Sequence, residues 1–181
     1  MVSLCSAGRD ESMMTNPQTA AADAQALLRA GELRFGTDES TFNMILCQRN
    51  HAQLRLVFSE YQRLTGHDIE KAIKNEFSGD IEDGFLAVVR SIKNQAAYFA
   101  KALNKSMKGL GTNDRDLIRL VVTRSEIDMG EIKREYAAKY GESLADAIKV
   151  NRFCVGSQIY VVDFSGRLFG RLQEVSVSVD W

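Results

Sequence analysis

The sequence contains one segment twice. Residues 36–74 align without a gap with residues 111–149, seventy-five positions further along the chain. The residues of the first copy that recur unchanged in the second are Gly36, Thr37, Arg49, Glu60, Tyr61, Gly66, Ala72, Ile73 and Lys74. A repeat of this length indicates a duplicated supersecondary unit, so a site found in one copy is to be sought in the other. The agreement stops at Lys149.

Composition narrows the class of protein. A chain of 181 residues with 45% hydrophobic content can form one domain or two small ones. Its net charge of -1 gives no reason to expect a nucleic-acid partner. Three widely spaced cysteines, with Cys47 on an apolar face, form no disulfide or metal pattern and favour a reducing compartment. No signal peptide or membrane-spanning run is evident, so we expect a cytoplasmic protein.

The spacing of apolar residues predicts an all-α fold. In the first copy, five stripes predict helices around residues 42–46, 54–64, 69–73, 85–92 and 98–103. The second copy supplies only three, around residues 117–121, 129–136 and 144–148. An alanine-rich helix over residues 20–30 leads into the first copy, after a polar linker at residues 6–18.

The last thirty-two residues differ from both copies. Residues 175–179 alternate valine and serine, which is typical of a strand. One interpretation is a β-hairpin that covers the incomplete second unit. The other, which we favour, is an unrelated, loosely ordered tail. The fold class is therefore all-α, with a five-helix repeat, a partial three-helix repeat and a β-prone or disordered tail.

A glycine-bearing loop precedes the first helix of each copy, at residues 31–37 and 107–112. Glycines let several backbone carbonyl oxygens turn in one direction. Such oxygens are suitable ligands for Ca²⁺, which usually needs a carboxylate as well. Glu76, forty residues after Gly36, falls between two predicted helices where it can lie beside the loop. In isolation the loop fits an ordinary interhelical turn equally well.

The glycine-bearing loop, the seventy-five-residue period and the carboxylate of Glu76 together resemble the pattern of the annexin family. The segments that match are 24–27, 31–33, 91–100 and 105–112, which read AQAL, GEL, SIKNQAAYFA and KSMKGLGT. The resemblance covers residues 1–149. It implies the remnant of a preceding repeat and a linker at 1–19, a complete repeat at 20–107 and an incomplete one at 108–149, followed by a divergent tail at 150–181.

The resemblance also implies metal ligands in the first copy. They are the carbonyl oxygens of Gly31, Arg34 and Gly36 with the carboxylate of Glu76, which together form a complete set. Phe35, at the tip of the same loop, is the expected membrane contact.

In the second copy the implied set is incomplete. Its carbonyl ligands would be those of Met107, Gly109 and Gly111. The acid is missing, because position 151 is Asn151, which offers one neutral oxygen. We therefore expect a weak or absent second site, with Leu110 as the counterpart of Phe35.

Other polar residues have structural interpretations. Four residues are expected to stabilise helix amino termini, the acids through the helix dipole and the asparagine as a cap: Asp38, Glu39, Asn113 and Asp114. An alternative for Asp38 or Glu39 is a lesser ion site. The recurring arginines, Arg49 and Arg124, are expected to bond carbonyl or carboxylate groups between helices. The two histidines, His51 and His67, are expected to be surface or capping residues.

The expected function is calcium-dependent binding to anionic phospholipid membranes, with Ca²⁺ as the cofactor and a peripheral membrane location when calcium is present. The alternative is a truncated, non-binding isoform or a helical fragment that binds a protein partner or itself through its uncovered partial repeat. An enzyme is not expected, because no Ser/His/Asp, Cys/His or paired-carboxylate motif stands out.

Overall fold

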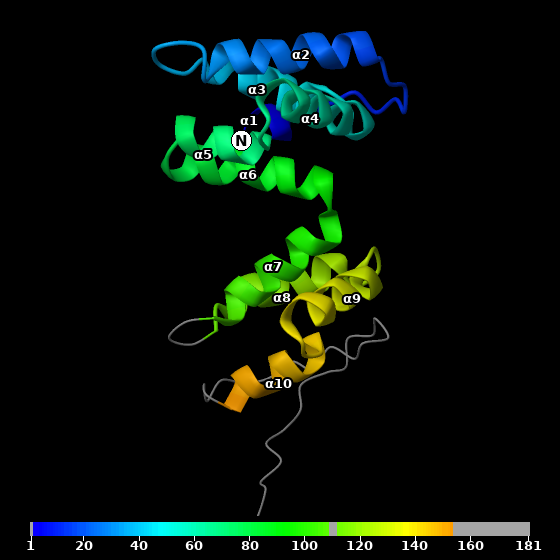
Figure 1. The fold of residues 1–181 in the computed structure, drawn as a ribbon. Coiled ribbons are helices and arrows are strands. Elements are labelled where there is room, and N and C mark those ends of the chain that lie inside the picture. Colours follow the sequence, from blue (N-terminus) through cyan, green and yellow to red (C-terminus); the bar gives the residue numbers. More distant parts are fainter. Residues whose placement is uncertain (1, 109–111, 154–181) are drawn as a thin grey trace, which may run out of the picture. The chain divides into compact units, whose positions relative to one another are not determined.

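The computed structural model describes residues 2–108 and 112–153, and these form helices joined by short loops, with no strand among them (Figure 1). The all-α prediction is thereby confirmed. The predicted β-prone segment lies outside the described residues. The helices are α1 Val2–Cys5, α2 Pro17–Ala30, α3 Glu39–Gln48, α4 His51–Thr65, α5 Ile69–Glu76, α6 Gly79–Lys93, α7 Gln95–Met107, α8 Asp114–Arg124, α9 Met129–Tyr140 and α10 Leu144–Phe153.

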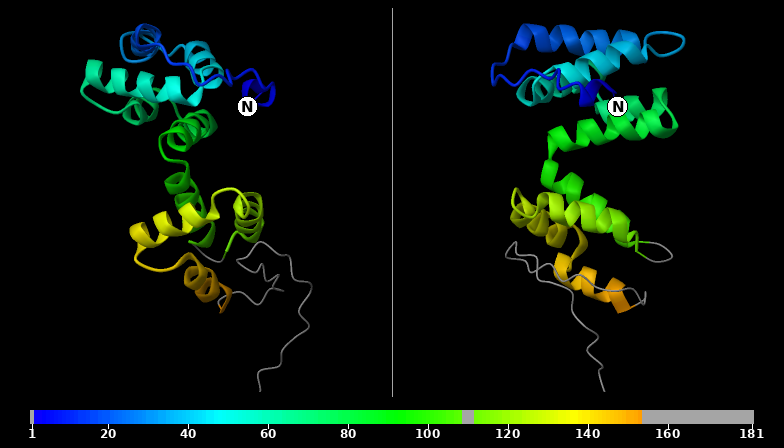
Figure 2. Two further views of the ribbon diagram at one scale, coloured as in Figure 1. Left: turned by 90° about the vertical axis from the view of Figure 1, so that its right-hand side faces the viewer. Right: turned by 180° about the vertical axis from the view of Figure 1, so that it is seen from behind.

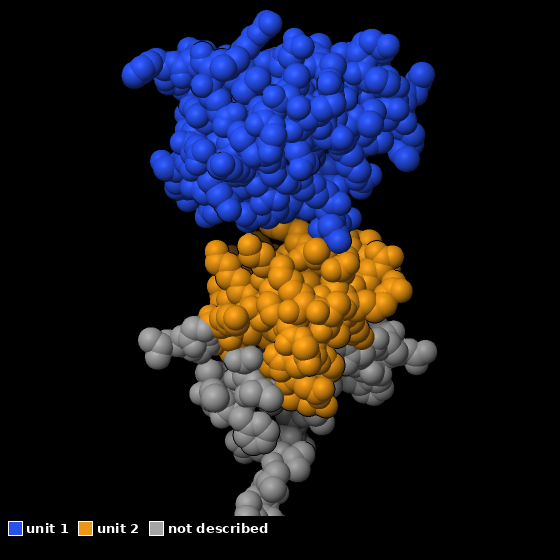
Figure 3. Space-filling view, in the orientation of Figure 1, with its two compact units in different colours: residues 1–95 blue, residues 96–181 orange. Residues whose placement is uncertain are grey.

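The chain divides into two compact units, Met1–Gln95 and Ala96–Trp181 (Figure 3). The division falls at the start of α7, because the buried residues of α7 belong to the core of the second unit. This boundary lies inside the range 20–107 that the resemblance assigns to the complete repeat. The repeat ranges themselves stay a prediction.

The core of the first unit is formed by α2 to α6. The helix α2 packs mainly against α4 and α3. Three aromatic rings meet at one end of this core: the ring centroid of Phe77 lies 5.0 Å from those of Phe42 and Phe85, both in edge-on geometry. Such pairs stabilise a core beyond the area they bury. Phe42 is completely buried.

Helix boundaries in this unit follow from local capping chemistry. Asn16, Asp38, Asn50 and Asp68 each precede a helix and accept a hydrogen bond from a backbone N–H of its first turn. Gly66 ends α4 with φ of 75°, the left-handed conformation that glycine adopts without strain. The predicted role of Asp38 as a helix-terminal acid is thus observed.

Two polar contacts tie the amino-terminal part of this unit together. The Arg49 guanidinium makes a two-pronged ion pair with Asp23 of α2, with Nε–Oδ2 and Nη2–Oδ1 distances of 2.7 and 3.0 Å. Arg9, in the segment predicted as a linker, donates to the carbonyl oxygens of Leu46 and Arg49 at the end of α3. Charge-assisted bonds of this kind are among the stronger polar contacts. The expected structural role of Arg49 is therefore seen.

The second unit has its own core, made by α7, α9 and α10 with Tyr136 among its most buried side chains. Arg124 pairs with Asp128, with an Nε–Oδ1 distance of 2.8 Å, and lies over the ring of Phe99. The helix α8 differs from its neighbours, because none of its residues is fully buried. Ile118 is 51% exposed and Val122 45% exposed. This helix therefore presents part of its hydrophobic surface to solvent.

Candidate functional site

The loop after α2 is a defined turn. The Gly31 N–H donates the capping hydrogen bond at the end of α2, to Leu27 O at 3.1 Å. The Arg34 N–H donates to Gly31 O, also at 3.1 Å. Gly36 has φ of 75°, where a residue with a Cβ atom would be strained. The loop ends where Asp38 N–H donates to Ala30 O at 2.7 Å. This turn and the α5–α6 turn lie at the same end of the unit (Figures 1 and 2).

Glu76, at the end of α5, lies against this loop. The Thr37 hydroxyl donates to Glu76 Oε2 at 2.8 Å and approaches Glu76 O at 3.3 Å. A Cβ atom placed on Gly31 would lie only 3.3 Å from Glu76 Cγ and 3.4 Å from Phe42 Cζ. Glycine at position 31 thus leaves room for the Glu76 side chain and the Phe42 ring. Residues about forty positions apart in the sequence form one partly buried site.

The donor atoms of this site suit a hard cation. Backbone carbonyl oxygens and a carboxylate are the ligands that Ca²⁺ prefers. The Gly31 carbonyl accepts one hydrogen bond from Arg34 N–H, and a carbonyl oxygen has a second lone pair. In the part of the chain that the structure describes, no cluster of three or more His, Cys, Asp or Glu side chains can hold a metal. A site here would therefore depend on the loop carbonyls.

Asp38 is occupied by its capping role. Its carboxylate accepts from the hydroxyl groups of Ser40 and Thr41, at 2.6 and 2.9 Å, and from both backbone N–H groups. The side-chain bonds of Ser40 and Thr41 lead the contacts that hold the pKa of Asp38 below its ordinary value. These bonds fix the start of α3 directly after the loop.

The tip of the loop is apolar and exposed. The Phe35 side chain is fully exposed, and Leu33 is 67% exposed. Of these two side chains, only Phe35 is predicted from the sequence as a membrane contact. Leu33 could have been found from its position two residues before Phe35 in the same glycine-bounded loop. Arg34 lies between the two, and its Nη1 is 3.9 Å from Asp38 Oδ2.

A third set of contacts is not predicted by the sequence. Glu32, the residue after Gly31, accepts a hydrogen bond from the Tyr61 hydroxyl at 2.8 Å through Oε2. Its other oxygen, Oε1, lies 3.1 Å from His67 Nε2. Burial, and then the hydrogen bond with Glu32, raise the pKa of Tyr61 above its ordinary value. The helix α4 and its following turn thus hold the loop from a second side.

The loop of the second copy lies partly outside the described residues. Met107 ends α7 and is buried, whereas Gly109, Leu110 and Gly111 lie outside the described residues, as does the side chain of Asn151. Asn113 N–H donates to Ser106 O at 2.7 Å, closing this loop as Asp38 closes the first. The segment from Ser106 to Asn113 is one residue shorter than the corresponding segment from Ala30 to Asp38. The two loops therefore differ in length just before the aligned Gly36 and Gly111.

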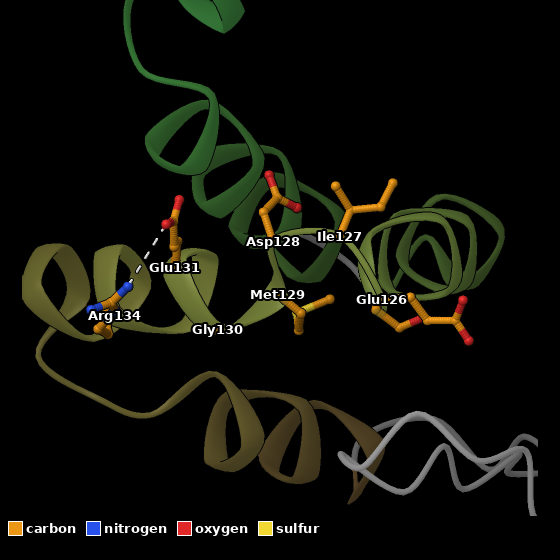
Figure 4. A pocket seen from close by; sticks show the side chains of 8 residues that line it. Glu126, Ile127, Asp128, Met129, Gly130, Glu131 and Arg134 are labelled. Atoms are coloured by element: carbon orange, nitrogen blue, oxygen red, sulfur yellow. Dashed lines mark ion pairs between the residues drawn. The ribbon is translucent and has the colours of Figure 1, made fainter.

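A different hollow lies at the turn between α8 and α9, with a volume of about 310 Å³ (Figure 4). The charged side chains on its wall include Glu131, which pairs with Arg134 at 3.9 Å, and Asp128, which pairs with Arg124. The lining of the hollow, among the described residues, includes none of the predicted ligands. This open hollow brings together no chemistry comparable with the loop at Gly31.

Comparison with known proteins points to one family. The family model "Annexin" matches residues 22–88 and 98–152. The chain is 55% identical to annexin A11 of Homo sapiens over 144 residues, which are 80% of this chain and 28% of that protein. The structure of annexin III superposes with a TM-score of 0.81 at 44% identity, over 83% of this chain and 47% of that one. That of calcium-bound annexin (Sm)1 superposes with a TM-score of 0.74 at 30% identity, over 92% and 46%.

These similarities place the chain in the annexin family, as the resemblance implied. Annexins are in general non-enzymatic proteins that bind phospholipid in a calcium-dependent manner. The chain spans less than half the length of each relative named above. No described helix has both the length and the apolar character needed to cross a bilayer.

Proposed function

We propose that this chain binds anionic phospholipid membranes in a calcium-dependent manner through the loop at residues 31–37. The proposed ligands are the carbonyl oxygens of Gly31, Arg34 and Gly36 with the carboxylate of Glu76. The observation that carries the proposal is the hydrogen bond from the Thr37 hydroxyl to Glu76 Oε2, beside a glycine that leaves room for the Glu76 side chain. It brings the one carboxylate of the proposed set to the carbonyl-bearing loop.

The chain's own residues would act in three ways. The loop backbone presents carbonyl oxygens, Thr37 holds the carboxylate of Glu76 toward them, and Phe35 extends into the surroundings of the loop. Bound calcium would supply a divalent charge with coordination positions left for lipid phosphate oxygens. Since protein and phosphate would share one ion, calcium affinity and membrane affinity should be coupled. The expected location is the cytoplasmic face of a membrane when calcium is raised.

The test is co-sedimentation with vesicles of phosphatidylserine and phosphatidylcholine over a series of calcium concentrations. We expect sedimentation that rises with calcium, reverses on chelation and fails with phosphatidylcholine alone. A chain that stays in the supernatant at millimolar calcium, while remaining folded by circular dichroism, would contradict the proposal.

Phe35→Ala should weaken membrane binding without changing stability. Full burial of a phenylalanine side chain stabilises by roughly 1.5–3 kcal/mol, so partial immersion of Phe35 should be worth about tenfold in vesicle affinity. Met13→Ala is the matched control, because Met13 is also an exposed apolar side chain but lies outside the loop. Equal vesicle affinities for the two variants would show that the loop tip does not enter the membrane.

A second candidate function rests on the exposed face of α8. Ile118, Val122 and the neighbouring Ile127, which is 69% exposed, offer apolar surface on which the chain would self-associate or bind a helical partner. Sedimentation equilibrium in the absence of lipid shows whether the chain self-associates. A monomer at micromolar concentration argues against self-association, and a dimer that Val122→Glu disrupts supports it.

A further inference from the structure

A buried tyrosine on α4 is hydrogen-bonded to the side chain that follows the first proposed ligand. Tyr61 is completely buried, and its hydroxyl donates to Glu32 Oε2 at 2.8 Å. Glu32 is adjacent to Gly31, so this bond joins the interior of the unit to the start of the loop. A hydrogen bond to a carboxylate is stronger than one between neutral groups. The loop is thereby fixed to the core by a side chain of its own.

The second oxygen of the same carboxylate is held from another direction. Glu32 Oε1 lies 3.1 Å from His67 Nε2, and the His67 ring lies edge-on to that of Tyr61, with centroids 6.2 Å apart. His67 follows the glycine that ends α4. Both oxygens of Glu32 are therefore engaged with α4 and its terminal turn. A carboxylate engaged at both oxygens serves as a brace and is poorly placed to bind a cation as well.

Glu76 has a different role at the same loop. Its Oε2 receives the Thr37 hydroxyl, at the far end of the loop from Glu32. The loop is thus held at its beginning by Glu32 and at its end by Thr37. Its three proposed ligand carbonyls lie between or beside these two anchors. Fixing both ends restricts the orientations available to those carbonyls.

We propose that Glu32, held by Tyr61 and His67, is a positioning residue that keeps the loop carbonyls in the conformation competent to bind calcium. This inference rests on the proposed function of the same loop. Without the brace, the loop would sample other conformations, and apparent calcium affinity falls in proportion to the competent fraction. The brace acts before any metal binds, so it can be measured in the metal-free chain.

The second copy provides a natural comparison. Tyr136 is the counterpart of Tyr61 and is also buried, but its hydroxyl accepts a hydrogen bond from Asn104 at 3.1 Å. The residue after Met107 is Lys108, where the first loop has Glu32, and position 142, which aligns with His67, is Glu142. The duplicated tyrosine therefore has a different partner. Tyr136→Phe is consequently a matched control for Tyr61→Phe, since each deletes one buried hydroxyl.

The first measurement is amide hydrogen exchange in the calcium-free chain. Tyr61→Phe and Glu32→Ala should each speed exchange of the hydrogen-bonded amides of Leu33, Arg34 and Asp38 by about tenfold, the loss expected for a hydrogen bond to a charged group. Glu32→Gln should speed exchange less than Glu32→Ala does, because its amide oxygen still accepts from Tyr61, although through a weaker, neutral hydrogen bond. Tyr136→Phe should leave these amides unchanged. Unchanged loop exchange in Tyr61→Phe would overturn the brace.

The second measurement is the calcium midpoint for binding to phosphatidylserine vesicles. We expect Tyr61→Phe and Glu32→Ala to raise it about three- to tenfold, with saturating binding preserved and Tyr136→Phe unaffected. Faster loop exchange with an unchanged midpoint would overturn the positioning role. Equal losses in Glu32→Gln and Glu32→Ala would also overturn it, since they would make the charge itself the requirement. A wild-type chain that binds no vesicles contradicts the proposed function instead, whatever the exchange data show.

Discussion

Glu76→Gln is expected to raise the calcium concentration needed for half-maximal vesicle binding by at least about tenfold. The change removes one negative charge and one strong oxygen donor while keeping the size of the side chain. Two unit charges about 4 Å apart near a protein surface attract by about 4 kcal/mol, and every 1.4 kcal/mol or so is a factor of about ten in affinity. Stability should change little, because the amide oxygen of the new side chain can still accept the hydrogen bond from Thr37. Vesicle co-sedimentation against calcium concentration measures the shift.

Glu11→Gln is the control for this change. Glu11 is exposed and lies in the amino-terminal segment, so the same loss of charge occurs away from the loop. Its calcium midpoint should match that of the wild type. If both variants shift alike, the effect comes from net charge attracting the ion to the surface. If neither shifts, Glu76 is not a ligand, and calcium binding, where present, belongs to another part of the chain.

The sequence was most informative where residues repeat. Gly36 and Gly66 recur in the second copy, and each occupies a left-handed conformation that the backbone of its turn requires. Arg49 and Arg124 also recur, and both form two-pronged pairs with an aspartate. Their partners differ, however, since that of Arg49 lies on another helix and that of Arg124 four residues further along the chain. The repeat predicted that the two arginines form structural contacts without predicting their partners.

The sequence was less informative about contacts between elements. Spacing alone placed Glu76 near a helix junction, but the packing of Phe42 with Phe77 brings that junction to Gly31. The contact of Glu32 is not predictable from the sequence, because its partner Tyr61 lies twenty-nine positions away on α4. A hydrogen bond at such separation leaves no periodic pattern in the chain. The assignment of α7 to the second unit likewise follows from which apolar faces meet.

Phe42→Ala should be the most destabilising of the substitutions considered for the first unit. Phe42 is completely buried, its ring is packed edge-on with Phe77, and it lies within contact of the Cβ position of Gly31. Replacing a buried phenylalanine by alanine costs about 3–5 kcal/mol, a large part of the roughly 5–15 kcal/mol that stabilises a domain. Urea denaturation followed by circular dichroism measures this cost. Phe42→Leu, which keeps more of the volume, should cost less and remain folded.

Phe35→Ala is the matched comparison, because it makes the same chemical change in the neighbouring loop, at a fully exposed site. Its free energy of unfolding should stay within about 0.5 kcal/mol of the wild type. The two phenylalanines should therefore separate stability from membrane contact: Phe42 supports the loop from the core, and Phe35 extends from its tip. Phe42→Leu should also weaken calcium-dependent binding, since this ring and the Glu76 side chain both lie beside Gly31. Similar unfolding free energies for Phe42→Ala and Phe35→Ala would show that the aromatic cluster does not hold the site together.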